Sequence, residues 1–257
     1  MVSIQNQIVL ITGASSGIGE ACAKIFAQAG ASLILAARRL DRLEKLAKTI
    51  ADEYQVQVYP LQLDVCDRSQ VETAFNALPE SWSSIDILIN NAGLSRGLDK
   101  LYEGDIQDWE EMIDTNVKGL LYVTRSIVPG MVNRKQGHVI NIASVAGQQS
   151  YPGGGVYCAT KAAVKTLSTG LKMDLLGTPI RVSNIDPGLV ETEFSQVRFH
   201  GDTERAKTVY KGLTPLTPED VAEVVLFCAT RPPHVSISDV LILATDQATA
   251  TMVHRQP

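Results

Sequence analysis

The stretch QIVLITGASSGIG, residues 7–19, decides the fold of this chain. A short apolar run, residues 7–12, passes directly into a loop that contains Gly13, Gly17 and Gly19, and a helical pattern follows. Nearly continuous apolar runs are typical of strands that are covered on both faces. The stretch therefore predicts a buried strand, a tight glycine turn and a helix.

The same alternation continues along the chain. Further strands are predicted at 32–37, 55–65, 85–90, 138–144, 180–187 and 238–243, and helices at 17–29, 41–53, 68–78, 105–131, 155–176 and 218–230. Such alternation predicts an α/β fold of the Rossmann type, a doubly wound parallel sheet of about seven strands with helices on both faces. Since no break in composition divides the sequence, we expect a single domain over residues 1–257.

Composition narrows the classes of function. The net charge of −5 argues against nucleic acid or an anionic membrane as a partner. No apolar run approaches the roughly 18 residues that a bilayer span requires, and the first apolar run lacks the basic flank of a signal peptide. The cysteines are scattered without a CxxC pair, which predicts no metal site and a reducing, cytoplasmic setting. They are Cys22, Cys66, Cys158 and Cys228.

The glycine loop is suited to a dinucleotide. Gly13 permits a tight turn, Gly17 lets the backbone approach a phosphate, and Gly19 lets the helix pack near the strand. The helix N-terminus offers free N–H groups and the positive end of its dipole to a pyrophosphate. A flexible turn is the alternative. We expect the loop to bind the cofactor through Gly13, Ser15, Ser16, Gly17, Ile18 and Gly19.

The end of the second strand bears on the choice of cofactor. Arg38 and Arg39 stand where NAD-selective folds place an acidic residue. Guanidinium groups suit a 2′-phosphate in charge and in bidentate geometry, which predicts NADP(H) over NAD(H). The alternative is a cationic surface turn that pairs with Asp41 or Glu44.

Asp64, followed by Val65, ends the third predicted strand. Its carboxylate could accept a hydrogen bond from an adenine amino group, with Val65 beside the cofactor. It could equally cap the helix that follows. The residue type leaves both interpretations open.

The stretch GGGVYCATKAAV, residues 153–164, places Tyr157 and Lys161 four apart at the start of a helix, where they share a face. A free tyrosine has a pKa of about 10, and a nearby ammonium group favours the phenolate and lowers that pKa. The pair therefore predicts a proton donor with a charge that tunes it. A surface helix that carries an aromatic ring and a charge is the alternative.

Six motifs then occur in order, namely TGASSGIG (12–19), NNAG (90–93), NVKG (116–119), NIASVAG (141–147), YCATK (157–161) and DPGLVETEF (186–194). The set resembles the short-chain dehydrogenases/reductases over nearly the whole chain. The resemblance implies a catalytic tetrad of Asn116, Ser144, Tyr157 and Lys161. It also implies that the cofactor is contacted by Tyr157, Lys161, Asn91, Ala92 and Gly93 and, on the nicotinamide side, by Pro187, Gly188, Val190 and Thr192.

The resemblance gives each member of the tetrad a task. Tyr157 acts as acid in reduction and as base in oxidation, and Lys161 also reaches the ribose hydroxyls. Ser144 donates to the substrate oxygen as negative charge builds there. Asn116 holds a water that links Lys161 to solvent.

A narrower resemblance is carried by IDTNVKGLLYVTRSIVPGMV, GHVINIASVAG, GGGVYCATKA, EFSQVRFHGD (193–202) and LTPEDVAE (216–223). These stretches are similar to the NADP-dependent 3-hydroxy acid dehydrogenases, which act on serine and L-allo-threonine. The similarity extends to the C-terminal tail, which departs from the family's proline-bearing version at Ala244–Thr245. The reaction implied is oxidation at C3 of a small 3-hydroxy acid, or reduction of the 3-oxo acid.

Such a substrate carries a carboxylate, which needs a cationic anchor. Arg198 is the main candidate, within a segment around 190–214 that we expect to form a substrate lid. A solvated loop arginine is the alternative, and Lys211 and Arg96 are further candidates. Gln148 follows the fifth strand and either contacts the substrate or faces solvent.

Two other functions compete with this one. The first is a reductase of larger ketones or of 3-oxoacyl groups on an acidic carrier protein, which the acidity of the chain disfavours. The second is an NADP-binding regulator without turnover, which an intact tetrad argues against. In the family that the chain resembles, the helices that correspond to 105–131 and 155–176 pair between subunits, which implies a homotetramer.

Overall fold

Within residues 2–256, which the computed structural model describes, seven strands form one parallel sheet in the order β3-β2-β1-β4-β5-β6-β7. The strands are β1 (Ile8–Thr12), β2 (Ser32–Ala37), β3 (Val58–Gln62), β4 (Ile87–Asn90), β5 (His138–Ile142), β6 (Arg181–Pro187) and β7 (Asp239–Ile242). The strand order reverses between β1 and β4, so the sheet is doubly wound as predicted. A ligand crevice is expected beyond the carboxyl ends of the strands at this point.

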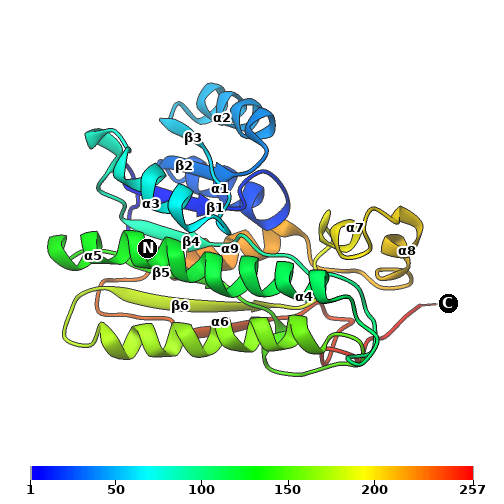
Figure 1. Ribbon diagram of the computed structural model, residues 1–257. Helices are drawn as coiled ribbons and strands as arrows, with labels where there is room; N and C mark the ends of the chain where they lie inside the picture. The colour runs from blue at the N-terminus through cyan, green and yellow to red at the C-terminus, as the bar shows by residue number, and fades with distance from the viewer. Residues whose placement is uncertain (1, 257) are drawn as a thin grey trace.

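Helices cover both faces of the sheet (Figure 1). One layer consists of α1 (Gly17–Gln28), α2 (Leu40–Tyr54) and α9 (Pro218–Ala229), and the other of α3 (Arg68–Asn76), α5 (Leu120–Arg134) and α6 (Gly155–Asp174). Successive residues of β1 point into different cores: Val9 and Ile11 pack under the first layer and Leu10 under the second. All three are fully buried, which explains why the run at 7–12 is apolar without alternation.

The helix predicted at 105–131 is interrupted. It consists of α4 (Ile106–Ile113), a π-helical turn η2 (Asp114–Gly119) and α5. A single widened turn barely disturbs the apolar periodicity from which the helix was predicted. The turn carries Asn116, and π-helical turns often occur at functional sites.

The expected lid segment contains two short helices, α7 (Phe194–Arg198) and α8 (Thr203–Thr208), which project from one end of the molecule (Figure 1). The chain then enters α9 through Thr217, whose side chain and that of Asp220 form a capping box. Two stretches of the described chain form single turns of 3₁₀-helix, η1 (Glu80–Trp82) and η3 (Val145–Gly147).

Candidate active site

A cavity of about 670 Å³ opens beyond the carboxyl ends of the strands. It is lined by most of the residues that the sequence singled out: Gly13, Ser15, Ser16, Gly17, Ile18, Arg38, Arg39, Asp64, Val65, Asn91, Ala92, Gly93, Ser144, Tyr157, Lys161, Pro187, Gly188, Val190, Thr192 and Arg198. Gly19, Asn116 and Gln148 do not line it. The glycine loop and the Tyr–Lys pair therefore share one cavity, as the sequence predicts.

The glycine loop has the geometry of a phosphate-binding turn. Gly13 and Gly17 have φ angles of +66° and +55°, in the left-handed region that favours glycine. A side chain on Gly19 would collide with the Gly13 carbonyl oxygen and the Asn91 amide. The Asn91 amide nitrogen donates to the carbonyl of Thr12, 2.9 Å away, and fixes the turn. The start of α1 is thereby held against the cavity, where its free N–H groups fit a pyrophosphate.

Arg39, one of the two arginines after β2, forms contacts that a simple surface turn does not predict. Arg39 donates through Nε and Nη2 to the Ser15 hydroxyl, at 3.2 and 3.0 Å, and through Nη2 to Ser16, at 2.8 Å. Its Nη1 pairs with Glu193, at 3.0 Å. The acidic partner therefore comes from the lid segment and not from the neighbouring turn.

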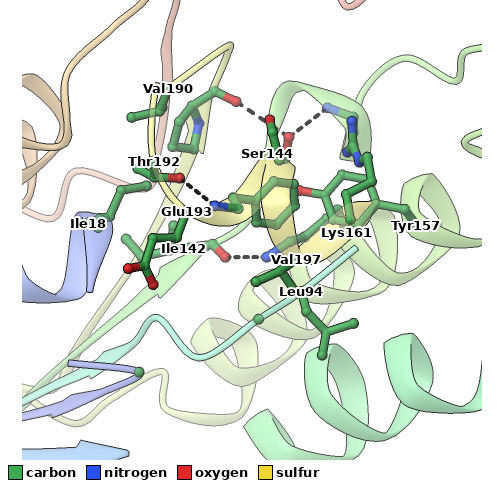
Figure 2. Close-up of a pocket in the computed structure, with 18 of the residues that line it drawn as sticks. Ile18, Leu94, Ile142, Ser144, Tyr157, Lys161, Val190, Thr192, Glu193 and Val197 are labelled. Atoms are coloured by element: carbon green, nitrogen blue, oxygen red, sulfur yellow. Dashed lines mark hydrogen bonds between the residues drawn. The ribbon is translucent and has the colours of Figure 1, made fainter. Parts of the chain in front are cut away.

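Tyr157 and Lys161 lie on the first turns of α6 and face the cavity (Figure 2). The Lys161 Nζ atom donates to the carbonyl of Ile142, 2.9 Å away. Burial lowers the pKa of Lys161 to about 8, and the buried carboxylate of Asp186 acts in the opposite direction. Lys161 is therefore an ammonium that loses its proton much more readily than an exposed lysine.

The pKa of Tyr157 departs from the expectation. Burial raises it above its ordinary value, while the Arg198 guanidinium and the Ser144 hydroxyl act to lower it. The predicted lowering by Lys161 is thus wrong for this structure, because the phenol is 7% exposed and loss of solvation dominates. The positive charge that acts on the phenol is that of Arg198.

Ser144 stands where β5 ends and η3 begins. Its hydroxyl oxygen accepts a hydrogen bond from the Ala146 N–H, at 3.1 Å, and donates to the Pro187 carbonyl, at 3.4 Å. The first distance is within the normal range of a hydrogen bond, whereas the second is long and indicates a weak bond. The hydroxyl proton can therefore turn to a substrate oxygen without the loss of a strong bond.

Asn116 is buried behind the cavity. Its Oδ1 accepts from the Leu94 N–H, and its Nδ2 donates to the Leu94 carbonyl and to Thr160, over 2.8, 2.8 and 3.0 Å. The side chain thus ties the segment after β4 to α6. The water link from Asn116 to Lys161 stays a prediction.

Arg198 is an interior residue of the cavity wall. Its side chain donates to Ser95 and to the Tyr151 hydroxyl, both at 3.1 Å, and lies 5.4 Å from the Tyr157 ring centroid. The residue is 9% exposed, so the alternative of a solvated loop arginine is wrong. Ser95 and Tyr151 were missed by sequence reasoning, since they are 103 and 47 residues away and no spacing signals them.

The structure does not bring the other anchor candidates to the cavity. Gln148 is exposed, and its amide donates to Asp186, so the expectation of a substrate contact is not met. Arg96 pairs with Glu111, at 2.7 Å, and is absent from the lining, as is Lys211.

Asp64 lines the cavity and accepts from the N–H of Cys66, at 3.0 Å. It does not cap α3, because Asp67 does so by accepting from the Gln70 N–H. The capping alternative is therefore wrong, and the adenine contact stays a prediction.

The C-terminal tail completes the wall. Gln247, Ala250, Thr251, Val253 and Arg255 line the cavity. The Arg255 guanidinium donates to the carbonyls of Val209 and Lys211 in the lid segment. The similarity of the tail to its relatives did not predict these contacts, because they depend on how two loops meet.

Residues 2–256 contain neither a cluster of metal-ligating side chains nor a membrane-spanning helix. No three His, Cys, Asp or Glu side chains gather there as a metal site requires. No helix in this part of the chain is both long and apolar enough to cross a bilayer.

Comparisons with known proteins agree with this geometry. The family model of the short chain dehydrogenases matches residues 7–202. The NADP-dependent 3-hydroxy acid dehydrogenase of Schizosaccharomyces pombe is 46% identical over 257 residues, covering 100% of this chain and 99% of that protein. The protein of the same name in Escherichia coli K12 is 47% identical, with coverage of 97% and 100%.

Solved structures give the same result. A closed form of serine dehydrogenase complexed with NADP⁺ superposes with a TM-score of 0.91 at 48% identity, covering 97% of this chain and 100% of that one. Serine dehydrogenase from Escherichia coli superposes with a TM-score of 0.82 at 43% identity, covering 94% of this chain and 100% of that one. With its doubly wound sheet, its glycine turn and its Tyr–Lys pair in one cavity, this chain belongs to the short-chain dehydrogenase family.

Proposed function

We propose that this protein is an NADP-dependent oxidoreductase that transfers hydride between the nicotinamide and C3 of small 3-hydroxy acids such as serine and L-allo-threonine. The observation that carries the proposal is the buried Arg198 guanidinium over the Tyr157 ring. Arg198 would anchor a carboxylate and Tyr157 would donate a proton, in the same cavity as the glycine turn. The printed functions of the relatives point to the same substrate class.

The chain's own residues fit NADP. The turn at Gly13 and Gly17 and the start of α1 would hold the pyrophosphate, and Arg38 and Arg39 would hold the 2′-phosphate. When bound, the nicotinamide exchanges a hydride with the substrate carbon. The protein must then manage the proton of the substrate oxygen.

Tyr157 is the group that gives or takes that proton. Its raised pKa keeps the phenol protonated at neutral pH, ready to act as the acid in reduction. In oxidation the phenolate must accept a proton, and the positive charge of Arg198 and the Ser144 hydroxyl favour that phenolate. Ser144 orients the substrate oxygen toward Tyr157.

Arg198 selects for short acids. In a 3-hydroxy acid only one carbon separates the carboxylate from the reacting carbon. An anchor directly beside Tyr157 therefore suits such a substrate better than a long acyl chain. Ser95 and Tyr151 hold the guanidinium in place, so little side-chain entropy is lost on binding.

The test compares acids with uncharged alcohols, with NADP⁺ and NAD⁺ in parallel, by the absorbance of the reduced cofactor. The wild type should oxidise L-serine, L-allo-threonine and 3-hydroxybutyrate. Arg198→Ala should lower kcat/KM for these acids by about 10- to 100-fold more than for neutral alcohols, because a charge-assisted contact is lost. An unchanged acid preference would remove the anchor role. Tight NADP(H) binding without any turnover would point to a regulator instead.

We also propose three properties at a larger scale. The segment 190–214 acts as the substrate lid, which α7 supports by carrying Arg198 to the cavity. The protein assembles as a homotetramer through the helices at 105–131 and 155–176. Its setting is cytoplasmic, which the four free cysteines support.

A further inference from the structure

Glu193 forms an ion-pair bridge at the mouth of the cofactor cavity. Its Oε2 lies 3.0 Å from Nη1 of Arg39, and its Oε1 lies 2.8 Å from Nη1 of Arg42. Oε2 also accepts from the same Arg42 nitrogen, at 3.0 Å. Arg39 and Glu193 line the cavity, whereas Arg42 does not. The carboxylate thus joins the expected 2′-phosphate site to a second arginine outside it.

We infer that Glu193 is a specificity-determining residue, an internal carboxylate that competes with the 2′-phosphate of the cofactor for the Arg39 guanidinium. The inference rests on the proposed use of NADP. It concerns how strongly this chain prefers NADP(H) over NAD(H).

The hydrogen bonds of Arg39 show why there is competition. Nε and Nη2 donate to the Ser15 and Ser16 hydroxyls, and Nη1 is held by Glu193. All three nitrogens are therefore engaged. A serine hydroxyl can rotate and donate to an arriving phosphate, but an ionised carboxylate can only accept. Glu193 is consequently the partner that must release Arg39 when the phosphate binds.

Arg42 keeps the competitor close. It contacts both carboxylate oxygens of Glu193, so the side chain has a partner after it leaves Arg39. These contacts also lower the pKa of Glu193, which stays ionised at neutral pH. A negative charge therefore remains beside the arriving phosphate and opposes it.

A cofactor without the 2′-phosphate does not meet this opposition. The 2′-hydroxyl of its ribose carries no negative charge, so the Arg39–Glu193 pair can stay in place. Glu193 thus reduces the preference for NADP(H) that Arg38 and Arg39 create. The side chain is 42% exposed, so solvent screens the effect to a moderate size.

The test uses two probes that differ only in the 2′-phosphate, adenosine 2′,5′-bisphosphate and 5′-AMP. Their Kd values are measured by calorimetry on the intact, cofactor-free protein. Glu193→Gln should tighten binding of the bisphosphate by about 3- to 10-fold and change that of 5′-AMP by less than about 2-fold. Glu193→Ala should act in the same direction.

Glu191→Gln is the matched control, since it removes the same charge from an exposed position two residues earlier. An equal effect of E191Q and E193Q, or no tightening in E193Q and E193A, would overturn the inference. If the wild type bound the bisphosphate no more tightly than 5′-AMP, the proposed use of NADP would itself be wrong. The ratio of the probes in the wild type therefore separates the two failures.

Discussion

Burial moves the pKa values of Tyr157 and Lys161 in opposite directions. It raises that of the phenol and lowers that of the ammonium, because in both cases the neutral form loses less solvation. The ionised forms depend on neighbours, Arg198 for the phenolate and Asp186 for the ammonium. Tyr157, Lys161, Arg198 and Asp186 thus interact electrostatically as one unit. Only the spacing of Tyr157 and Lys161 could be recognised in the sequence.

Replacement of the phenol tests the proton step alone. Tyr157→Phe removes one oxygen and keeps the ring that packs against Phe194. Turnover should fall by at least about 10²- to 10⁴-fold, because positioned proton transfer is lost. Binding of NADP⁺, measured by calorimetry, should stay within about 2-fold of the wild type. A variant that retained most of its activity would remove Tyr157 from the proton step.

Asp186 should control the pH range of activity. Its fully buried carboxylate holds the pKa of Lys161 up, against burial. Asp186→Asn removes this support, so the pKa of Lys161 falls below about 8. Activity that needs the ammonium is lost as pH rises through that pKa. The alkaline limb of kcat/KM against pH should therefore move to lower pH, by about one unit or less.

Asp239→Asn is the control for this shift. Asp239 contacts the same Lys165 as Asp186, at 2.7 Å, but is 42% exposed. Its removal should leave the alkaline limb in place. Equal shifts in the two variants would show a general effect of charge rather than a specific effect of the buried Asp186 carboxylate on Lys161.

At the scale of elements, the start of α1 is positioned by the absence of a side chain. Gly19→Ala would push the methyl group into the Gly13 carbonyl and the Asn91 amide, so α1 must move away from the turn. The free energy of unfolding should fall by about 1–3 kcal/mol, and NADP⁺ should bind more weakly. Urea unfolding and calorimetry measure the two effects.

Gly170→Ala adds the same methyl group to α6, where nothing described lies within 4 Å of it. It should leave NADP⁺ affinity unchanged and raise the free energy of unfolding by about 0.5–1 kcal/mol, as expected for glycine in a helix. If Gly19→Ala bound NADP⁺ as well as Gly170→Ala does, close packing of α1 on the turn would not matter for the cofactor.

Elements that depend on local patterns could be predicted from the sequence. The apolar run at 7–12 and the glycine spacing each specify their structure within a few residues. The π-helical turn at Asp114–Gly119 could not be found, because one widened turn leaves the helical pattern nearly intact. The short helices α7 and α8 were also missed, since five or six residues give no reliable period.

The site shows the same division. Residues that stand at fixed distances within a motif, such as Tyr157 and Lys161, were placed correctly in the cavity. Contacts between distant segments were not predicted, such as Arg39 with Glu193 across 154 residues. They depend on where the segment 190–214 packs, and a single sequence carries no local signal for its position. The predicted direction of the Tyr157 pKa shift was wrong for the same reason, since burial depends on tertiary structure.

At the scale of the whole molecule, large apolar side chains remain exposed in the layer that contains α5 and α6, on these helices, on the adjoining α4 and in the turn after α6. They include Ile106 at 64%, Leu121 at 41%, Met173 at 70% and Leu176 at 88%. Exposed apolar groups on these neighbouring helices favour association there, because their burial is favourable. This is the layer through which we propose that the homotetramer assembles.

Light scattering after gel filtration tests the assembly. The wild type should have four times the 27.8 kDa mass of one chain. Leu121→Glu and Met173→Glu should each lower that mass, because a buried unpaired carboxylate opposes association. Val2→Glu places the same charge on a residue that is 40% exposed and outside this layer, so it should leave the mass unchanged. A wild type of single-chain mass, or a mass that neither helix variant alters, would show that this layer does not hold the subunits together.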